Sequence, residues 1–139
     1  MFDINTHSFS TSAQEGFTFN LKLPTGADSG AKLTVLGELS PTVKNYSRKK
    51  FAEYQQRQVM LKRKGKEDEQ ISLEEAEEMA VENALVRLLG WEGISEDGKE
   101  VKFTKEKARE VLTAHSWLRD QIISESQDVL NFQPKTLKI

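Results

Sequence analysis

The chain has 139 residues, a formal net charge of −2 at pH 7 and no cysteine. A chain of this length can bury about 70% of its unfolded surface without disulfides or metals, so we expect one domain. The lack of cysteine excludes disulfide frameworks, cysteine-ligated zinc, iron–sulfur clusters and thiol catalysis, and favours a reducing compartment. No window holds the roughly 18 apolar residues of a membrane span and no leader pattern opens the chain, so we expect neither membrane insertion nor export.

The first third of the chain predicts a β-hairpin after a loosely ordered start. Residues 1–16 carry few apolar side chains, which is typical of a mobile end. Apolar and polar residues then alternate over 17–23 and again over 33–37, and the segment 24–30 between them holds a proline and two glycines. This pattern predicts a hairpin over residues 17–38. A lone hairpin is marginally stable, so it must pack on helices or on another subunit.

After the hairpin the apolar period changes from two to about 3.6, which predicts helices. The first is expected over residues 44–64, where Phe51, Tyr54 and Leu61 can share one face. Lysines and arginines would take its other sides. A polar segment containing Gly65 ends it.

A second helix is expected over residues 73–89 as the central helix of the core. Ser72 and Glu75 form the sequence signature of a capping box at its start. Its apolar stripe begins at Leu73, and Gly90 stands where a left-handed C-terminal cap is wanted.

Residues 91–103 are expected to cross over through a turn at Asp97-Gly98, with Ile94 and Val101 in short strands on either side. The fold class is therefore α+β and mainly α, with an N-terminal β-hairpin packed on about four helices. One domain would span residues 17–132.

The last two helices are expected over residues 104–114 and 117–131. Thr104 is placed to cap the first of them and Ser116 the second. Residues 133–139 follow Phe132 as a short polar tail.

The net charge hides a strong asymmetry. Residues 44–66 carry nine basic residues and one acid, whereas residues 67–82 carry eight acids and no base. If the two segments are neighbouring antiparallel helices, their charges can pair across the two helices or from one subunit to the next, which would allow self-association. Alternatively, both segments are solvated faces, which is the usual meaning of a charge run.

Sites for chemistry are weakly supported. His7 and His115 have no histidine partner within one helical turn. Glu74 and Glu78 have the i,i+4 spacing of a carboxylate pair, but no second motif completes a metal or acid–base site, so a solvated face is the better interpretation. We therefore predict no catalytic residue, no metal site and no cofactor.

Nucleic-acid binding is a more serious possibility. Arg48, Lys49 and Lys50 lie on a basic helix that could follow phosphates, and aromatic residues beside them could stack on bases. The sequence pI near 5.8 and the acidic segment that follows argue against nucleic acid as the main partner.

The order of the predicted helices and strands, and the turn and cap residues between them, resemble those of the tail assembly chaperones of long-tailed bacteriophages and related prophage tail proteins. The resemblance covers about residues 17–132 and depends on four runs: Leu33-Thr34-Val35-Leu36-Gly37, Leu88-Leu89-Gly90-Trp91-Glu92-Gly93-Ile94, Val101-Lys102-Phe103-Thr104 and Trp117-Leu118-Arg119-Asp120-Gln121-Ile122.

The resemblance implies a protein without enzymatic activity that acts in the cytoplasm of the host cell. Such a chaperone binds the tape-measure protein, keeps it soluble, recruits tail-tube protein, and leaves before the tail is finished. Two other classes stay open. One is a structural virion protein, such as a head–tail joining or tail-completion protein, and the other is a small nucleic-acid-binding regulator.

A chaperone of this kind needs apolar anchors for its client beside charged surfaces that keep the complex in solution. The candidate anchors are Trp91, Ile94, Trp117 and Phe132, and the candidate charged contacts are Arg48, Lys49, Lys50, Glu74 and Glu78. For each tryptophan the alternative is a plug in the core next to a helix end.

Overall fold

The computed structural model describes residues 1–5, 8–65 and 71–134. His7, the charged residues 66–69 and most of the predicted tail lie outside the described residues. The described part of the chain has an α+β fold with five α-helices and an N-terminal three-stranded antiparallel sheet, which confirms the predicted fold class. The elements are α1 (Phe9–Glu15), β1 (Phe17–Lys22), β2 (Asp28–Val35), α2 (Pro41–Arg63), α3 (Leu73–Arg87), β3 (Leu88–Glu92), β4 (Ser95–Glu96), β5 (Lys99–Glu100), α4 (Lys105–Ala114), α5 (Ser116–Gln127) and the 3-10 helix η1 (Val129–Phe132).

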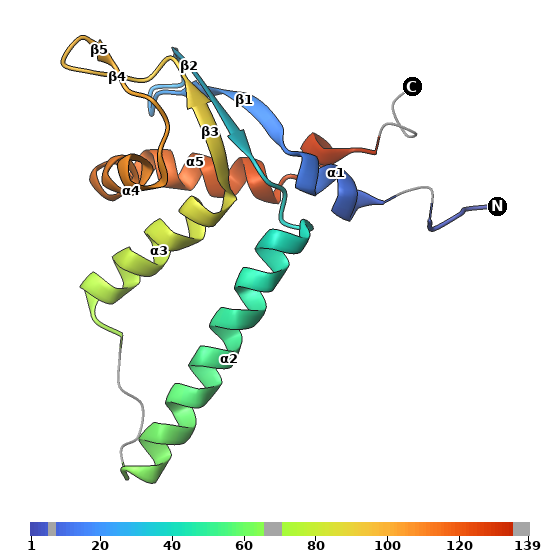
Figure 1. The fold of residues 1–139 in the computed structure, drawn as a ribbon, viewed down its shortest axis with the longest axis vertical. Coiled ribbons are helices and arrows are strands. Elements are labelled where there is room, and N and C mark those ends of the chain that lie inside the picture. Colours follow the sequence, from blue (N-terminus) through green and yellow to red (C-terminus); the bar gives the residue numbers. More distant parts are fainter. Residues whose placement is uncertain (6–7, 66–70, 135–139) are drawn as a thin grey trace.

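The sheet and the short helices form a body from which α2 and α3 extend (Figure 1). The sheet lies against α5, with α4 beside it, and α1 and η1 lie together at one end of the sheet. Helices α2 and α3 leave the same side of the body and diverge along their length.

The sheet contains the predicted hairpin and one strand more. Strands β1 and β2 pair antiparallel with Phe19 opposite Leu33, and β3 pairs with the other edge of β2. The sequence predicted helix through residue 89 and a left-handed cap at Gly90, and both predictions are wrong. Helix α3 ends at Arg87, Leu88 is extended, and Gly90 lies opposite Thr34 in the sheet. A third strand satisfies the open edge of a hairpin that would be marginal alone.

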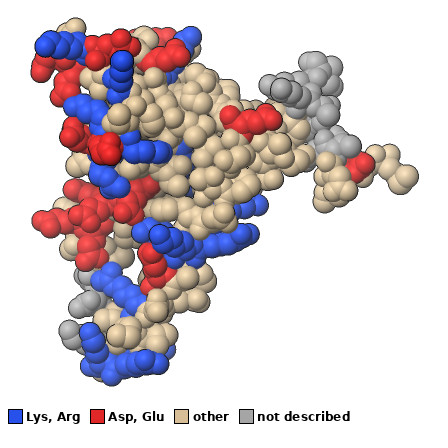
Figure 2. All heavy atoms as spheres, in the orientation of Figure 1, with Lys and Arg blue, Asp and Glu red and all other residues tan. Residues whose placement is uncertain are grey.

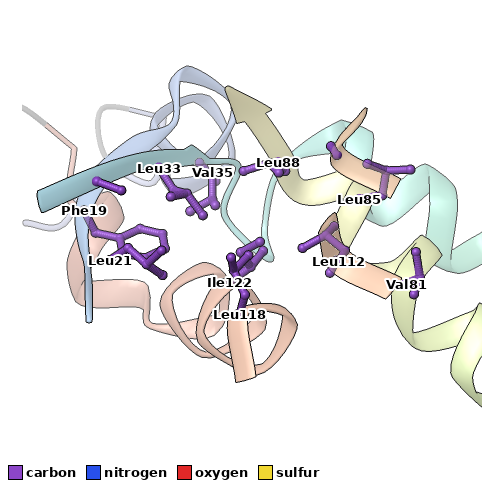
Figure 3. Close-up of a cluster of buried hydrophobic side chains, with 14 of the residues drawn as sticks. Phe19, Leu21, Leu33, Val35, Val81, Leu85, Leu88, Leu112, Leu118 and Ile122 are labelled. Carbon is purple, nitrogen blue, oxygen red and sulfur yellow. The ribbon is translucent and has the colours of Figure 1, made fainter. Parts of the chain in front are cut away.

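Alternation along β1 and β2 places one face of the sheet in the core. Phe19 and Leu21 from β1 and Leu33 and Val35 from β2 are all buried. They face Leu118 and Ile122 on α5, and Leu85, Leu88 and Leu112 continue the cluster toward α3 and α4 (Figure 3). The period-two pattern therefore marked the inward face of the hairpin correctly.

The N-terminal segment is more ordered than its composition predicted. Helix α1 occupies Phe9–Glu15, and the Ser8 side chain accepts a hydrogen bond from the Thr11 N–H. Ala13 is buried, and its carbonyl accepts the Gly37 N–H at 2.9 Å. The prediction of a loose start is wrong for this helix, because its contacts come from one small buried residue, Ala13, and from hydrogen bonds between Gln14 and Thr42, and these give no periodic apolar signal.

Helix α2 is capped inside the body and exposed beyond it. It begins at Pro41, three residues earlier than predicted, and the buried Ser40 side chain accepts the Val43 N–H at 3.2 Å. Phe51, Tyr54 and Leu61 were predicted to share one face of this helix, but that face is not buried at Phe51 and Tyr54. Both rings are exposed, and the buried residues of α2 are Val43 and Leu61.

Helix α3 belongs to the core only in its second half. The Ser72 side chain accepts the Glu75 N–H at 3.2 Å, as the capping signature predicts. Leu73, however, is 76% exposed, and the buried residues of α3 begin at Val81. The predicted central core helix is therefore partly wrong, because its first two turns extend past the body.

In the C-terminal half of the chain, the observed turns and helix starts agree more closely with the predicted ones. Asp97 and Gly98 have positive φ values of 51° and 82°, as a tight hairpin turn requires, and join β4 to β5. Thr104 caps α4 as predicted. The predicted cap at Ser116 is wrong, because Ser116 is the first residue of α5 and the N-cap position is His115, whose side chain makes no capping bond. Helix α5 ends at Gln127, and η1 covers the last predicted turn.

We predict that Gly37→Ala destabilises the fold by about 1–3 kcal/mol, because overpacking a tight site forces neighbours to move. A Cβ atom at Gly37 would lie 2.7 Å from the Ala13 Cβ and 3.0 Å from the Phe132 ring. Urea denaturation of the two proteins measures the difference. Gly90→Ala is the matched control, since no atom lies within 4 Å of a Cβ built there. Equal destabilisation by both substitutions would contradict this packing of α1 on η1.

Candidate functional site

Several exposed large apolar side chains lie on the two helices that leave the body. We define the arm as α2 together with residues 73–80 of α3. Phe51 is 62% exposed and Leu73 76% exposed. The other exposed large apolar side chains of the arm are Tyr54, Val59, Met60 and Met79. Exposed apolar side chains gathered on one substructure make the arm a candidate surface for contact with a partner.

The two helices of the arm are bridged by ion pairs. Lys50 Nζ lies 3.0 Å from a Glu82 carboxylate oxygen, and an Arg57 guanidinium nitrogen lies 3.2 Å from one of Glu75. The hydrogen bond to Glu82 raises the pKa of Lys50. These side chains are partly exposed, so each pair contributes at most about 1 kcal/mol. Pairing across the helices, one of the two predicted alternatives, is therefore present for these residues.

The remaining charges of the arm face solvent. Basic side chains gather at the far end of α2 and acidic ones along α3 (Figure 2). Arg48 and Lys49 are exposed and are in no ion pair with a described acidic residue, whereas the neighbouring Lys50 turns toward α3. The predicted basic trio is thus split between a solvent-facing pair and a residue that holds the arm together.

Glu74 and Glu78 lie on the exposed first half of α3. With Glu77 they line an open groove of about 390 Å³ between α3 and the α4–α5 pair. Arg109 and Arg119 stand on the other wall of this groove. The described residues contain no group of three histidine, aspartate or glutamate side chains arranged to hold a metal ion.

Trp91 and Phe132, two of the four predicted anchors, have structural contacts. The Trp91 indole N–H donates to the Val101 carbonyl at 2.8 Å, and its ring meets Phe103 edge to face with centroids 5.1 Å apart. Trp91 therefore fastens β3 to the segment after β5. Phe132 is only 4% exposed and packs edge to face on Phe17, which leaves little of its ring for a partner.

Ile94 and Trp117, the other two, lie together. Both line a groove of about 300 Å³ between the β4–β5 hairpin and helices α4 and α5, and both are half-buried. Lys107 at the rim pairs with Glu96 at 2.6 Å and with Glu110 at 3.1 Å. The hydrogen bond to Glu96 raises the pKa of Lys107. The arrangement offers an apolar floor with a charged rim.

One polar group in the interior was not predicted. Arg87 is 3% exposed and pairs with the Glu38 carboxylate. It also donates to the Ser126 hydroxyl at 2.9 Å and to the Asn83 carbonyl at 3.2 Å. The sequence does contain a signal for this buried arginine, because Arg87 stands within the apolar run at the end of α3. An arginine in such a run must find polar partners.

We predict that Trp91→Ala lowers the free energy of unfolding by about 2–3 kcal/mol, since it removes a packed ring and leaves the Val101 carbonyl without its donor. Phe51→Ala is the matched control, because an exposed aromatic residue on a helix should change stability by no more than about 0.5 kcal/mol. Thermal and urea denaturation measure both. A larger loss for Phe51→Ala than for Trp91→Ala would show that the arm ring is buried in solution.

The chain was compared with known proteins. A family model described as YdaY prophage protein matches residues 44–138, which is more than half of the chain. No curated protein and no solved structure matches. None of the described helices has both the length and the apolar content needed to cross a membrane.

Proposed function

The chain belongs to the YdaY prophage protein family, and on this basis we propose that it is a phage tail assembly chaperone. It binds the tape-measure protein, keeps it in solution and recruits tail-tube subunits in the cytoplasm of the host cell. Its role is to bind and release partners, without catalysis. A prophage origin supports a phage assembly role, and the order of elements that resembles tail assembly chaperones supports this particular one.

The exposed apolar surface of the arm is the observation that carries the proposal. Phe51 and Tyr54 are one helical turn apart on α2, and Leu73 is 76% exposed on α3. Helical clients are commonly bound through apolar residues at such spacing. The charges around these residues would keep both the chaperone and its complex soluble.

The groove that contains Ile94 and Trp117 supplies a second apolar contact on the body. It is separate from the arm, because its walls are the β4–β5 hairpin, α4 and α5. Two apolar contacts on one chaperone would give one for the tape-measure protein and one for a tail-tube subunit.

A specific observation also favours the nucleic-acid alternative. Phe51 and Tyr54 are exposed on the same helix as Arg48 and Lys49, which is the combination that binds single strands. Against it, Lys50 is engaged by Glu82 within the arm, and the acidic face of α3 lies alongside. We therefore retain it as the second candidate.

The first test is co-expression of the tagged chain with the tape-measure protein encoded by the same prophage. We expect the client to become soluble and to co-purify. The triple variant F51A/Y54A/L73A should reduce co-purification at least about tenfold, since apolar anchors dominate binding energy. Its melting temperature should stay within a few degrees of the wild type.

The matched control is L23A/V129A/L130A, which removes three exposed apolar side chains outside the arm. It should co-purify with the client as the wild type does. An insoluble client with both proteins well expressed would contradict the proposal. Recovery of the chain in purified phage particles would instead favour a structural virion protein. Binding to single-stranded DNA that falls steeply with salt and is lost in R48Q/K49Q would favour the regulator.

A further inference from the structure

A third concave site lies where the arm leaves the body. We call it the basal hollow, and its volume is about 590 Å³. Residues of α2, α3 and α4 line it. Its apolar floor is formed by Tyr46, Leu85 and Val86. Its basic rim is formed by Lys49, Lys105 and Arg109.

The basal hollow carries an excess of positive charge. Glu82 is the one acidic residue among the described residues that line it, and Lys50 already pairs with it at 3.0 Å. Lys49 and Arg109 are in no ion pair with a described acidic residue. The hollow therefore suits a segment that carries carboxylates beside an apolar side chain.

The chain itself contains such a segment. We define the arm tip as residues 73–78 of α3. It presents the exposed Leu73 together with Glu74, Glu77 and Glu78, none of which pairs with a described basic residue. Positions 73 and 77 and positions 74 and 78 are each four apart, so these four side chains occupy neighbouring positions on one helix surface.

Leu73 of the arm tip cannot reach the floor of the hollow in its own chain, although Glu74, Glu77 and Glu78 share a groove with Arg109 of that chain. Leu73 in the tip and Leu85 in the hollow are twelve residues apart in the same helix, a distance of about 18 Å. The helix cannot fold back on itself without breaking. Leu73 can therefore pack on the floor of a hollow only in another molecule.

We propose that the arm tip of one copy of this protein docks in the basal hollow of a second copy. Leu73 packs on the floor formed by Tyr46 and Val86, and the three glutamates meet Lys49 and Arg109 at the rim. The two surfaces are different patches of the same chain, so the contact is head to tail, and each added copy leaves one tip and one hollow open. The inference does not require the client of the proposed chaperone.

Sedimentation velocity of the full chain alone tests the proposal. We expect the sedimentation coefficient to rise with protein concentration at about 50 mM salt and to fall toward the monomer value at about 500 mM, where the Debye length is much shorter. The tip variant E74Q/E77Q/E78Q and the hollow variant K49Q/R109Q should each raise the dissociation constant about tenfold or more. Both changes are at exposed positions, and circular dichroism checks that each variant is folded.

Mixing the two variants gives the decisive result. The hollow of the tip variant and the tip of the hollow variant are both intact, so an equimolar mixture should form a one-to-one complex that does not extend further. The matched controls, E15Q/E92Q/E100Q and K32Q/K99Q, change equal numbers of exposed charges elsewhere and should assemble as the wild type does.

A wild-type chain that stays monomeric at low salt would overturn the proposal. Assembly that survives in both variants would also overturn it. A mixture that fails to recover the complex would do so as well, because mixing restores a head-to-tail contact but does not restore a symmetric one. These results are independent of client binding, so they separate a failure of this inference from a failure of the proposed function.

Discussion

The structure depends on the buried guanidinium of Arg87. It binds the Glu38 carboxylate, the Ser126 hydroxyl and Asn83, and so joins α3 to α5 and to the segment that follows β2. The backbone at this point is tied as well, because the Leu36 N–H donates to the Arg87 carbonyl at 2.7 Å. Ser126 in turn donates to the Leu36 carbonyl at 2.7 Å. A buried charge is costly without partners, so this network fixes one arrangement of the elements that meet there.

The same network fixes the positions at which the two arm helices join the body. Arg87 is the last residue of α3, and α2 begins at Pro41, three residues after Glu38. Both arm helices are therefore anchored to one buried group, while farther out they are held by the two partly exposed pairs Lys50–Glu82 and Arg57–Glu75. The body is stable through its apolar core, and the arm can expose apolar side chains because its position does not depend on burying them.

Much of the fold was predictable from local signals, and the misses have physical causes. Period-two alternation identified β1 and β2, and the Asp97-Gly98 turn and the Thr104 cap were found from residue chemistry alone. Strand β3 was missed because Leu88 continues the apolar pattern of the helix before it, so the change of conformation is decided by the open edge of β2. Tertiary pairing overrode the local period.

For the candidate site the sequence located residues but not their exposure. Ile94 and Trp117 were named from their places at element ends, and the fold brings them into one groove. Phe51 and Tyr54 were predicted to share one face of α2 with Leu61, and the spacing alone does not say whether that face is covered. Whether a helix has a neighbour on that side is a tertiary fact, and along most of α2 it has none among the described elements.

Helix α3 passes directly into β3, with Arg87 as its last residue and Leu88 as the first of the strand. Its fifteen residues make a rod about 22 Å long whose far end is the free part of the arm. The helix and the strand are joined by a single peptide bond with no linker between them, beside the Arg87 network. A displacement of the far end of α3 would therefore act directly on the hydrogen bonds between β2 and β3.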